Sequence, residues 1–233
     1  MATTHGDING FDFWGEAAFP KWSDHSVSTF GRTVFRTVND IQGGADGGSL
    51  EATFDLVAPT GVIAEEIQTY RFEGGGQSRI IDCEFAIHAT HGPIVMGDTK
   101  EGTFAIRVVK ALDSPPGHME NASGASGEKA IWAKRSNWVD YYGRVAGEDV
   151  GLAIFDHPDN LRAPTYWHAR AYGLPRRIRS ASNRLPVTAV GTGAMIFRWA
   201  ARSSCATACS SITGIRLRPE SLRRTGNLLR TSR

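Results

Sequence analysis

Charged side chains gather in one glycine-rich segment of the sequence, GDTKEGTFAIR at residues 97–107. Asp98 and Glu101 lie three residues apart on an expected turn, and Lys100 and Arg107 add positive charge beside them. Two carboxylates at this spacing could work as a general acid/base pair or could accept hydrogen bonds from sugar hydroxyls. Alternatively, Glu101 and Arg107 form a solvent-exposed ion pair of little energetic weight.

A second polar and aromatic cluster occupies two neighbouring segments, FDHPDN at residues 155–160 and YWHARAYG at residues 166–173. A histidine beside a carboxylate suits general base catalysis or metal ligation, and Trp and Tyr rings offer flat faces on which a sugar can stack. Alternatively, Pro158 and Asn160 form a turn and the aromatic rings fill the core. No metal-binding spacing such as His-x-x-x-His is present, so we predict no metal site. The cluster consists of Asp156, His157, Asn160, Trp167, His168, Arg170 and Tyr172.

Weaker mixtures of the same kind occur where His5 lies near Asp7, and where Asp140 lies among aromatic residues. Taken together, the clusters give two sets of candidate residues. We predict catalytic roles for Asp98, Glu101, Arg107, His157, His168 and Arg170. We predict ligand-binding roles for His5, Asp7, Lys134, Trp138, Asp140, Asn160, Trp167 and Tyr172.

The elements that must position these residues read as strands. Around the charged turn, Cys83, Phe85 and Ile87 alternate with polar residues, and so do Phe104 and Ile106. A period of two is typical of a sheet with one buried face. We therefore expect a hairpin of strands within residues 80–109 that presents the charged turn at its end. Cys83 is expected to be a buried, small apolar residue.

Similar patterns recur along most of the chain. Short strands separated by glycine turns predict an all-β fold, an antiparallel β-sandwich or a barrel. No segment before Leu174 shows a sustained helical period, and residues 113–130 read as a long Pro, Gly and Ser-rich loop. The further expected strands are residues 27–38, 49–59, 62–74, 131–143, 150–160 and 164–173.

The charge balance changes abruptly after Leu174. Residues 1–174 contain 14 Lys and Arg against 23 Asp and Glu, a net charge of −9, whereas residues 175–233 contain 12 Arg and one acid, a net charge of +11. The basic segment shows neither strand alternation nor a lasting helical face. We therefore predict a domain at residues 1–174 and a disordered tail at 175–233. Clustered arginine is typical of nucleic-acid-binding arms, but no aromatic platform accompanies it, so we predict no nucleic-acid partner.

No apolar run is long enough to span a membrane, and the first residues lack the basic and apolar regions of a signal peptide. We expect a soluble protein without a membrane partner, and the sequence assigns it no compartment. The three cysteines form neither an even disulfide framework nor a four-ligand metal pattern. The sequence identifies no cofactor.

Several ordered blocks of the sequence resemble one bacterial protein family. They are HGDINGFDFWGE, IDCEFAIHATHGPIVMGDTKEGTFAIRV, ENASGASGEKAIWAKRSNWVDYYG, GLAIFDHPDN and PTYWHARAYGL, and they run from His5 to Leu174. These blocks are similar to a family of unknown function labelled PmoA-like, or methane oxygenase PmoA. That family resembles β-sandwiches of the galactose-mutarotase supersandwich type, which implies carbohydrate chemistry by analogy. The label implies no activity, because the membrane methane oxygenase needs spanning helices and this sequence has none.

The chain departs from the family's pattern at both ends. A His-rich block is expected before HGD, yet only MATT precedes it, so we expect a truncated N-terminus. An Asn-Pro-Phe-Gly run, an RYR strand and a His-Gly-Asp turn are expected after YGL and are missing. Read one base back with suitable third bases, PRRIRSASNRLPVTAVG becomes SAANPFGIKSFTGDRRR, which contains the Asn-Pro-Phe-Gly run. We therefore predict that residues after Leu174 are read out of frame, which leaves an incomplete sandwich with an unpaired sheet edge.

Three functions are compatible with these residues. The first is an enzyme that acts on a glycan or a small sugar. The second is a non-catalytic sandwich that binds carbohydrate or another partner. The third is a metal-dependent oxidoreductase, the kind of protein that the family label names, and it would use His5, His157 or His168. The expected partner is a glycan or another small molecule.

Overall fold

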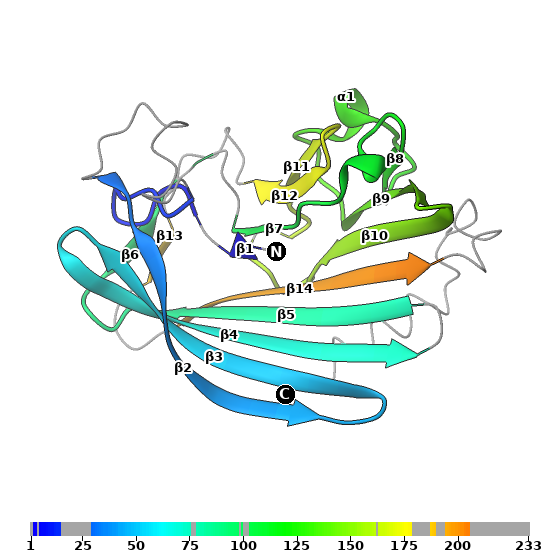
Figure 1. Cartoon of the computed structure of the whole chain (residues 1–233). Helices are drawn as coiled ribbons and strands as arrows, with labels where there is room; N and C mark the ends of the chain where they lie inside the picture. The colour runs from blue at the N-terminus through cyan, green and yellow to red at the C-terminus, as the bar shows by residue number, and fades with distance from the viewer. Residues whose placement is uncertain are drawn as a thin grey trace.

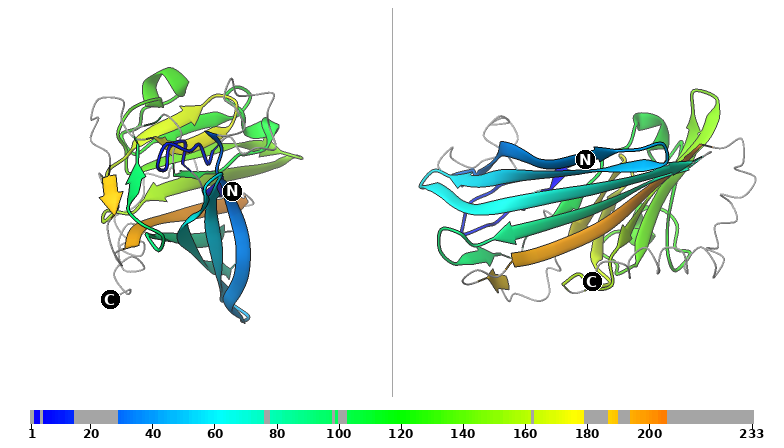
Figure 2. Two further views of the ribbon diagram at one scale, coloured as in Figure 1. Left: turned by 90° about the vertical axis from the view of Figure 1, so that its left-hand side faces the viewer. Right: turned by 90° about the horizontal axis from the view of Figure 1, so that it is seen from below.

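The chain folds into an all-β sandwich of antiparallel strands, as the sequence predicts (Figure 1). A sheet of eight strands and a sheet of four lie in two layers, and two short strands form a separate ladder (Figure 2). The structure is a computed structural model, and it describes residues 2–3, 5–14, 29–75, 78–97, 99, 103–161, 163–178, 187–189 and 194–205.

The large sheet consists of two antiparallel meanders joined by one strand from late in the chain. Strands β2 to β5 form the first meander, strands β8 to β10 form the second, and β14 lies between β5 and β10. In spatial order the strands are β2 (Arg32–Gly43), β3 (Gly47–Ala58), β4 (Gly61–Gly75), β5 (Ser78–His88), β14 (Ala194–Cys205), β10 (Glu148–Asp156), β9 (Trp138–Val145) and β8 (His118–Asn121).

The small sheet is made of short strands from distant parts of the chain. Its order is β1 (Ala2–Thr3), β7 (Phe104–Ala105), β12 (Leu174–Ile178) and β11 (Tyr166–Arg170). The separate ladder pairs β6 (Ile94–Met96) with β13 (Val187–Ala189), and two short helical turns are η3 (Lys110–Leu112) and α1 (Glu128–Ile131). Within the described ranges, no helix is long and apolar enough to cross a membrane.

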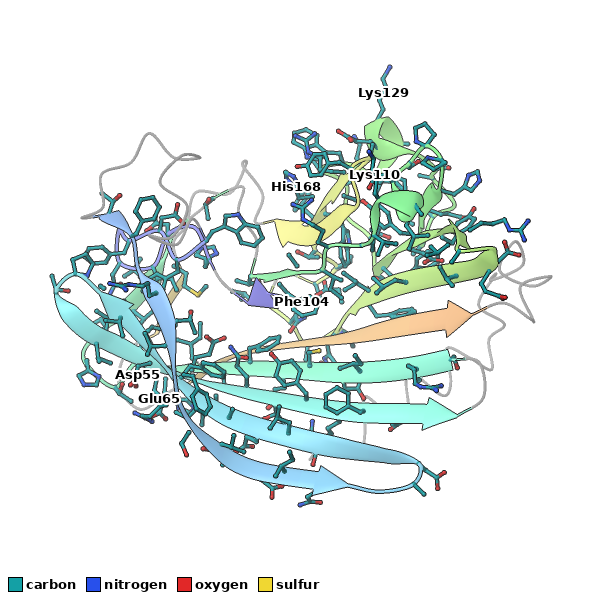
Figure 3. The ribbon with its side chains drawn as sticks, in the orientation of Figure 1. Asp55, Glu65, Phe104, Lys110, Lys129 and His168 are labelled. Carbon is teal, nitrogen blue, oxygen red and sulfur yellow. The ribbon has the colours of Figure 1, made fainter. Side chains whose placement is uncertain are left out.

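The core lies between the two sheets, where alternate residues of β5 meet the small sheet. Cys83, Phe85 and Ile87 are buried, as the alternation predicts. The ring of Phe85 packs against that of Phe104 in β7, with 5.8 Å between the ring centroids. Figure 3 shows Phe104 between the two layers. Cys83 is a free thiol whose burial raises its pKa to about 12, so its predicted role as a buried apolar residue is confirmed.

The expected hairpin within residues 80–109 is wrong. Strand β5 pairs with β4 and β14, whereas β7 pairs with β1 and β12 in the opposite sheet. Apolar and polar residues alternate in both segments because each sheet buries one of its faces. Alternation alone does not tell whether two strands lie side by side or face each other across a core.

The N-terminal segment is bonded to β6 and the residue that follows it. The backbone N–H of Asn9 donates to the Val95 carbonyl at 2.9 Å, and the Val95 N–H donates to Asn9 Oδ1 at 2.7 Å. His5 Nε2 donates to the Gly97 carbonyl at 2.9 Å, and the Gly97 N–H donates to the Asp7 carbonyl at 3.0 Å. A Cβ atom at Gly97 would overlap the Asp7 carboxylate, so a side chain at this position would force the Asp7 side chain to move.

Strand β14 lies in the part of the chain that is expected to be disordered. Residues 194–204 pair with β5 and residues 199–205 pair with β10, so these residues close the centre of the large sheet. The segment after Leu174, which is expected to be a disordered tail, thus contains a strand that is paired on both sides, and residues 206–233 lie outside the described residues. The sequence AMIFRWAARS is mostly apolar over one strand length, a local pattern that the high arginine content of the surrounding segment obscured. The frame change itself concerns the gene and stays a prediction.

Candidate functional site

Three side chains alternate along β11 on the face of the small sheet that is turned away from the core. They belong to Tyr166, His168 and Arg170, and the two residues between them, Trp167 and Ala169, are buried in the core. Figure 3 shows His168 on this outer side. We call this face and its neighbours the β11 surface, which consists of Arg107, Glu128, Trp132, Arg135, Tyr166, His168, Arg170 and Tyr172.

A loop after α1 is bonded along β11 and completes this surface. The Ala133 N–H donates to the Trp167 carbonyl at 2.8 Å, and the Trp167 N–H donates to the Lys134 carbonyl at 3.1 Å. These bonds fix Trp132 and Arg135 next to the alternating side chains of β11. The loop therefore brings a second set of functional groups to a face that β11 alone would leave sparse.

An ion pair anchors the centre of the β11 surface. Arg170 Nη1 donates to Glu128 Oε1 at 2.6 Å, and the Ala171 N–H donates to Glu128 Oε2 at 2.7 Å. The hydrogen bond from Ala171 is the main cause that lowers the pKa of Glu128, and the Arg170 guanidinium adds to it against the opposing effect of burial. Glu128 is therefore held as a carboxylate with both oxygens engaged.

His168 holds the Arg170 side chain in place through a hydrogen bond. Arg170 Nε donates to His168 Nε2 at 3.1 Å. A guanidinium nitrogen can only donate, so His168 Nε2 must accept and carries no hydrogen. His168 is buried, and its ring lies edge-on to Trp132 at 6.4 Å between centroids. This geometry gives His168 a positioning role for Arg170, whereas its predicted catalytic role stays a prediction.

Three arginines on this surface each stack on a different aromatic ring. Contacts of this kind occur about once per 70–80 residues in proteins, so about three are expected in a chain of 233 residues, and the notable feature is that these three lie on one surface. Arg170 has Glu128 as its partner, but no carboxylate among the described residues pairs with Arg107 or Arg135. The guanidinium carbons lie above the ring centroids at 4.8 Å for Arg135 on Tyr166, 5.3 Å for Arg170 on Trp132 and 5.8 Å for Arg107 on Tyr172.

The other cluster expected from the sequence forms a separate turn at the end of β10. Asn160 Nδ2 donates to Asp156 Oδ1 at 2.8 Å, and the Thr165 N–H donates to Asp156 Oδ2 at 2.8 Å. His157 Nδ1 accepts a hydrogen bond from the Asp159 N–H at 3.1 Å. These contacts match the structural alternative, in which Asp156 fixes the loop between β10 and β11. His157 and Asn160 are therefore not part of the β11 surface.

Four further candidate residues lie outside the β11 surface. Trp167 is buried, and its Nε1 donates to the Ser136 carbonyl at 2.7 Å, so its predicted role as a ligand platform is wrong because its ring fills the core. Trp138 and Asp140 lie on the outer face of the large sheet, the opposite side of the sandwich from the β11 surface. Lys134 is exposed beside the β11 surface.

The remaining candidates lie near the start of the chain and the charged turn. His5 is buried and lines a small pocket, and Asp7 accepts a hydrogen bond from the Gly10 N–H at 2.9 Å. Asp98 and Glu101 lie outside the described residues, so their roles stay predictions. In the described part of the chain, no group of three or more His, Cys, Asp and Glu side chains is arranged to hold a metal ion.

Sequence reasoning missed four residues of the β11 surface. Tyr166 carries a usable signal, because it shares the period of two with His168 and Arg170. The sequence gives no comparable signal for Glu128, Trp132 and Arg135. They come from a segment that is far from β11 in sequence and that reads partly as a loop. Only the tertiary structure brings them to β11.

A family model described as a family of unknown function, DUF6807, matches residues 1–199. The match includes every residue of the β11 surface and extends past Leu174 into β14. It agrees with the resemblance to a family of unknown function and does not test the PmoA-like label. No curated protein matches the chain.

Proposed function

This chain belongs to the family of unknown function DUF6807, and on that premise we propose that its β11 surface binds a carbohydrate that carries acidic groups. The observation that carries the proposal is the set of three arginine–aromatic stacks on one face, two of which contain an arginine with no carboxylate partner among the described residues. The fold supplies no function by itself, so the proposal rests on this site.

The aromatic rings supply the contact with sugar. Trp132 and Tyr172 are exposed at 42% and 49%, so both rings are open to contact with a ligand. The Arg170 guanidinium stacks on Trp132. Exposed, rigid aromatic faces stack on the apolar faces of sugar rings with little loss of side-chain entropy.

The arginines supply the preference for acidic groups. Arg107 and Arg135 are exposed, and stacking on Tyr172 and Tyr166 restricts their guanidinium groups. A guanidinium held in place binds carboxylate or sulfate with two parallel hydrogen bonds. We therefore expect uronic-acid or sulfated saccharides to bind more tightly than neutral ones.

Binding fits the β11 surface better than hydrolysis does. Glu128 is an ionised carboxylate bonded to Arg170 and to the Ala171 N–H, whereas a general acid must hold a proton near neutral pH. Of the six residues in the enzyme hypothesis, Asp98 and Glu101 lie outside the described residues, and their roles stay predictions. The non-catalytic hypothesis is therefore the one that the β11 surface favours.

A carbohydrate also fits better than single-stranded nucleic acid, which likewise binds cationic and aromatic surfaces. Residues 1–174 carry a net charge of −9, and Glu128 lies in the centre of the surface. Both features disfavour a densely charged polyphosphate more than a saccharide that carries only one or two acidic groups.

The test is binding of the full chain to an array of neutral, uronic-acid and sulfated oligosaccharides, followed by calorimetry on the best ligand. We expect Arg135→Gln to weaken binding by about tenfold, the effect of one charge-assisted contact. Arg144→Gln is the matched control, because Arg144 is also exposed but lies on the large sheet beside Asp149. Equal effects of the two substitutions, or tighter binding to oligo(dT) than to any saccharide, would overturn the proposal. Product detected by mass spectrometry would favour the enzyme instead.

A further inference from the structure

Strand β2 forms one edge of the large sheet, and its outer side is open (Figure 1). Among the described residues, only β3 pairs with it, and every residue of β2 except Thr33 is exposed. An edge strand presents backbone N–H and C=O groups along its open side, and these can pair with a strand of another chain. Strand β2 is twelve residues long, whereas the strand at the opposite edge, β8, has four. The long edge is therefore the side at which the sheet can be extended.

An apolar strip lies on the inner face of this edge, which is the face turned toward the core. Phe35, Val38 and Ile41 are exposed at 58%, 47% and 72%. Their spacing of three residues arises because the register with β3 shifts twice, between Phe35 and Thr37 and between Val38 and Asp40. These two bulges keep the three side chains opposite inner-face residues of β3. Apolar side chains that gather on one exposed face indicate an interaction site.

Charged side chains lie on the outer face of the same strand. Arg36, the extra residue of the first bulge, forms ion pairs with Glu65 and, at 3.0 Å, with Asp55. These two contacts use two of the five N–H donors of the guanidinium. Asp40 Oδ2 accepts a hydrogen bond from Gln42 Nε2 at 2.9 Å. Arg36 and Asp40 are both exposed, so each can bind a further group of opposite charge.

The residues of β2 are complementary to those of a second β2 strand. Two antiparallel copies that meet with Val38 opposite Val38 place residues of the same face opposite each other. On the inner face the pairs are apolar, and on the outer face a cation meets a carboxylate and a hydroxyl meets an amide. Opposed residues of this kind stabilise a sheet. The pairs are Val38 with Val38, Phe35 with Ile41, Arg36 with Asp40 and Thr37 with Asn39.

The bulges favour a second copy over an unrelated strand. Each bulge adds one residue to β2, so a regular strand would fall out of register with β2 on passing each bulge. The two bulges are symmetric about Val38, because one is formed by residues 36–37 and the other by residues 39–40. In the antiparallel pair each bulge therefore meets a bulge of the other copy. Two residues face two, and the register is kept along the strand.

We propose that β2 pairs with β2 of a second copy about a two-fold axis at Val38 and forms a symmetric dimer. The two eight-stranded sheets become one continuous sheet, with the two apolar strips side by side on its inner face. Such an interface uses the same surface of both copies, so it closes on itself. Assembly stops at the dimer because β8, the remaining edge, is short. The dimer does not depend on the β11 surface, which lies on the other sheet.

The test is sedimentation equilibrium of the full chain between about 1 and about 500 μM protein. We expect a monomer–dimer equilibrium with a dissociation constant on the order of 10 μM, because one pair of strands makes a small interface. A monomer throughout this range, or an open series of larger assemblies, would overturn the proposal.

Charge variants test the pairing. Val38→Lys puts two ammonium groups opposite each other at the axis and should weaken the dimer by at least about tenfold. Val109→Lys is the matched control, because Val109 is exposed at 56% but lies outside β2. Asp40→Lys sets a lysine against Arg36 on both sides of the axis and should weaken the dimer by a similar factor, whereas Asp46→Lys in the β2–β3 turn should not. Equal dissociation constants for a variant and its control would contradict the assignment.

A cross-link tests the register. Val38→Cys should form a disulfide-linked dimer under mild oxidation, because residues opposite each other have Cβ atoms about 4.5–5.5 Å apart. Thr37→Cys should cross-link much less, since the two copies of residue 37 are diagonal neighbours about 7–8 Å apart. The unmodified chain gives the background from its own three cysteines. Cross-linking of Thr37→Cys that equals or exceeds that of Val38→Cys would show that the two-fold axis is not at Val38.

Discussion

Trp167 belongs to β11 and Trp132 to the loop that is bonded to it, but the two rings have different surroundings. Trp132 is exposed over Arg170, whereas Trp167 is buried and donates to the Ser136 carbonyl. We expect Trp167→Phe to lower the free energy of unfolding by about 1.5–3 kcal/mol, because it opens a cavity and leaves a buried carbonyl without its donor. Trp132→Ala should change it by less than about 1 kcal/mol, as measured by urea unfolding.

Ligand affinity is the control for this pair. Trp132→Ala should weaken saccharide binding, while folded Trp167→Phe should bind like the unmodified chain. The opposite pattern would show that the buried tryptophan is the ligand platform and that the exposed one is not.

Glu128 makes the β11 surface sensitive to acid. Its pKa is lowered from 4.5 by the Ala171 N–H and by Arg170, so the ionised form is favoured in the folded state. Such a group adds stability that is fully present above pH 4.5 and is lost as the pH falls through the lowered pKa of the folded state. We expect the difference in unfolding free energy between the unmodified chain and Glu128→Gln to shrink between pH 6 and pH 3, measured by urea unfolding at each pH. A difference that stays constant over this range would contradict the ion pair.

Residue types alone predicted part of the site. His168, Arg170 and Tyr172 were identified because histidine, arginine and tyrosine close together suit ligand binding. The residues that contact Arg170, Glu128 and Trp132, were not identified, because only the tertiary structure brings them to β11. Residue types also misjudged Trp167, because an aromatic residue reads the same in sequence whether it fills the core or faces solvent.

At the scale of elements, strands with a buried face were predicted best. The expected strands at 49–59 and 62–74 correspond to β3 and β4, and the inner face of β3 carries a clear apolar period. Strand β2 was expected at 27–38 but runs over Arg32–Gly43. It is an exposed edge strand with two register shifts, so neither face shows the period of two.

Strand β14 offers a direct test of the end of the fold. Ala200 is opposite Asp82 in β5 and Phe155 in β10, so its strand is paired on both sides. We expect Ala200→Pro to lower the free energy of unfolding by at least about 2 kcal/mol, because proline removes a ladder hydrogen bond in the middle of a sheet. Ala200→Ser keeps the N–H and should have a much smaller effect. Identical urea unfolding of both variants would show that β14 is not part of the stable fold.

At the scale of the whole molecule, two observations bear on the predicted frame change after Leu174. The family match continues to residue 199, and β14 extends the sheet to Cys205. The hypothesis predicts that resequencing the locus finds one more base near the codon for Leu174. A locus that reads through Arg233 in the present frame would refute it, and the change of charge at residue 175 would then be a property of the protein.

The position of β14 also determines the order in which the large sheet can form during synthesis on the ribosome. The β2–β5 meander is complete at His88 and the β8–β10 meander at Asp156, but the strand between them begins only at Ala194. Until that strand has left the exit tunnel, β5 and β10 lack the partner that joins them. A nascent chain therefore carries two half-sheets with open edges, and such pairings between distant segments fold slowly and are prone to aggregation. The growing chain is thus most in need of chaperones late in translation, after most of its strands have already been made.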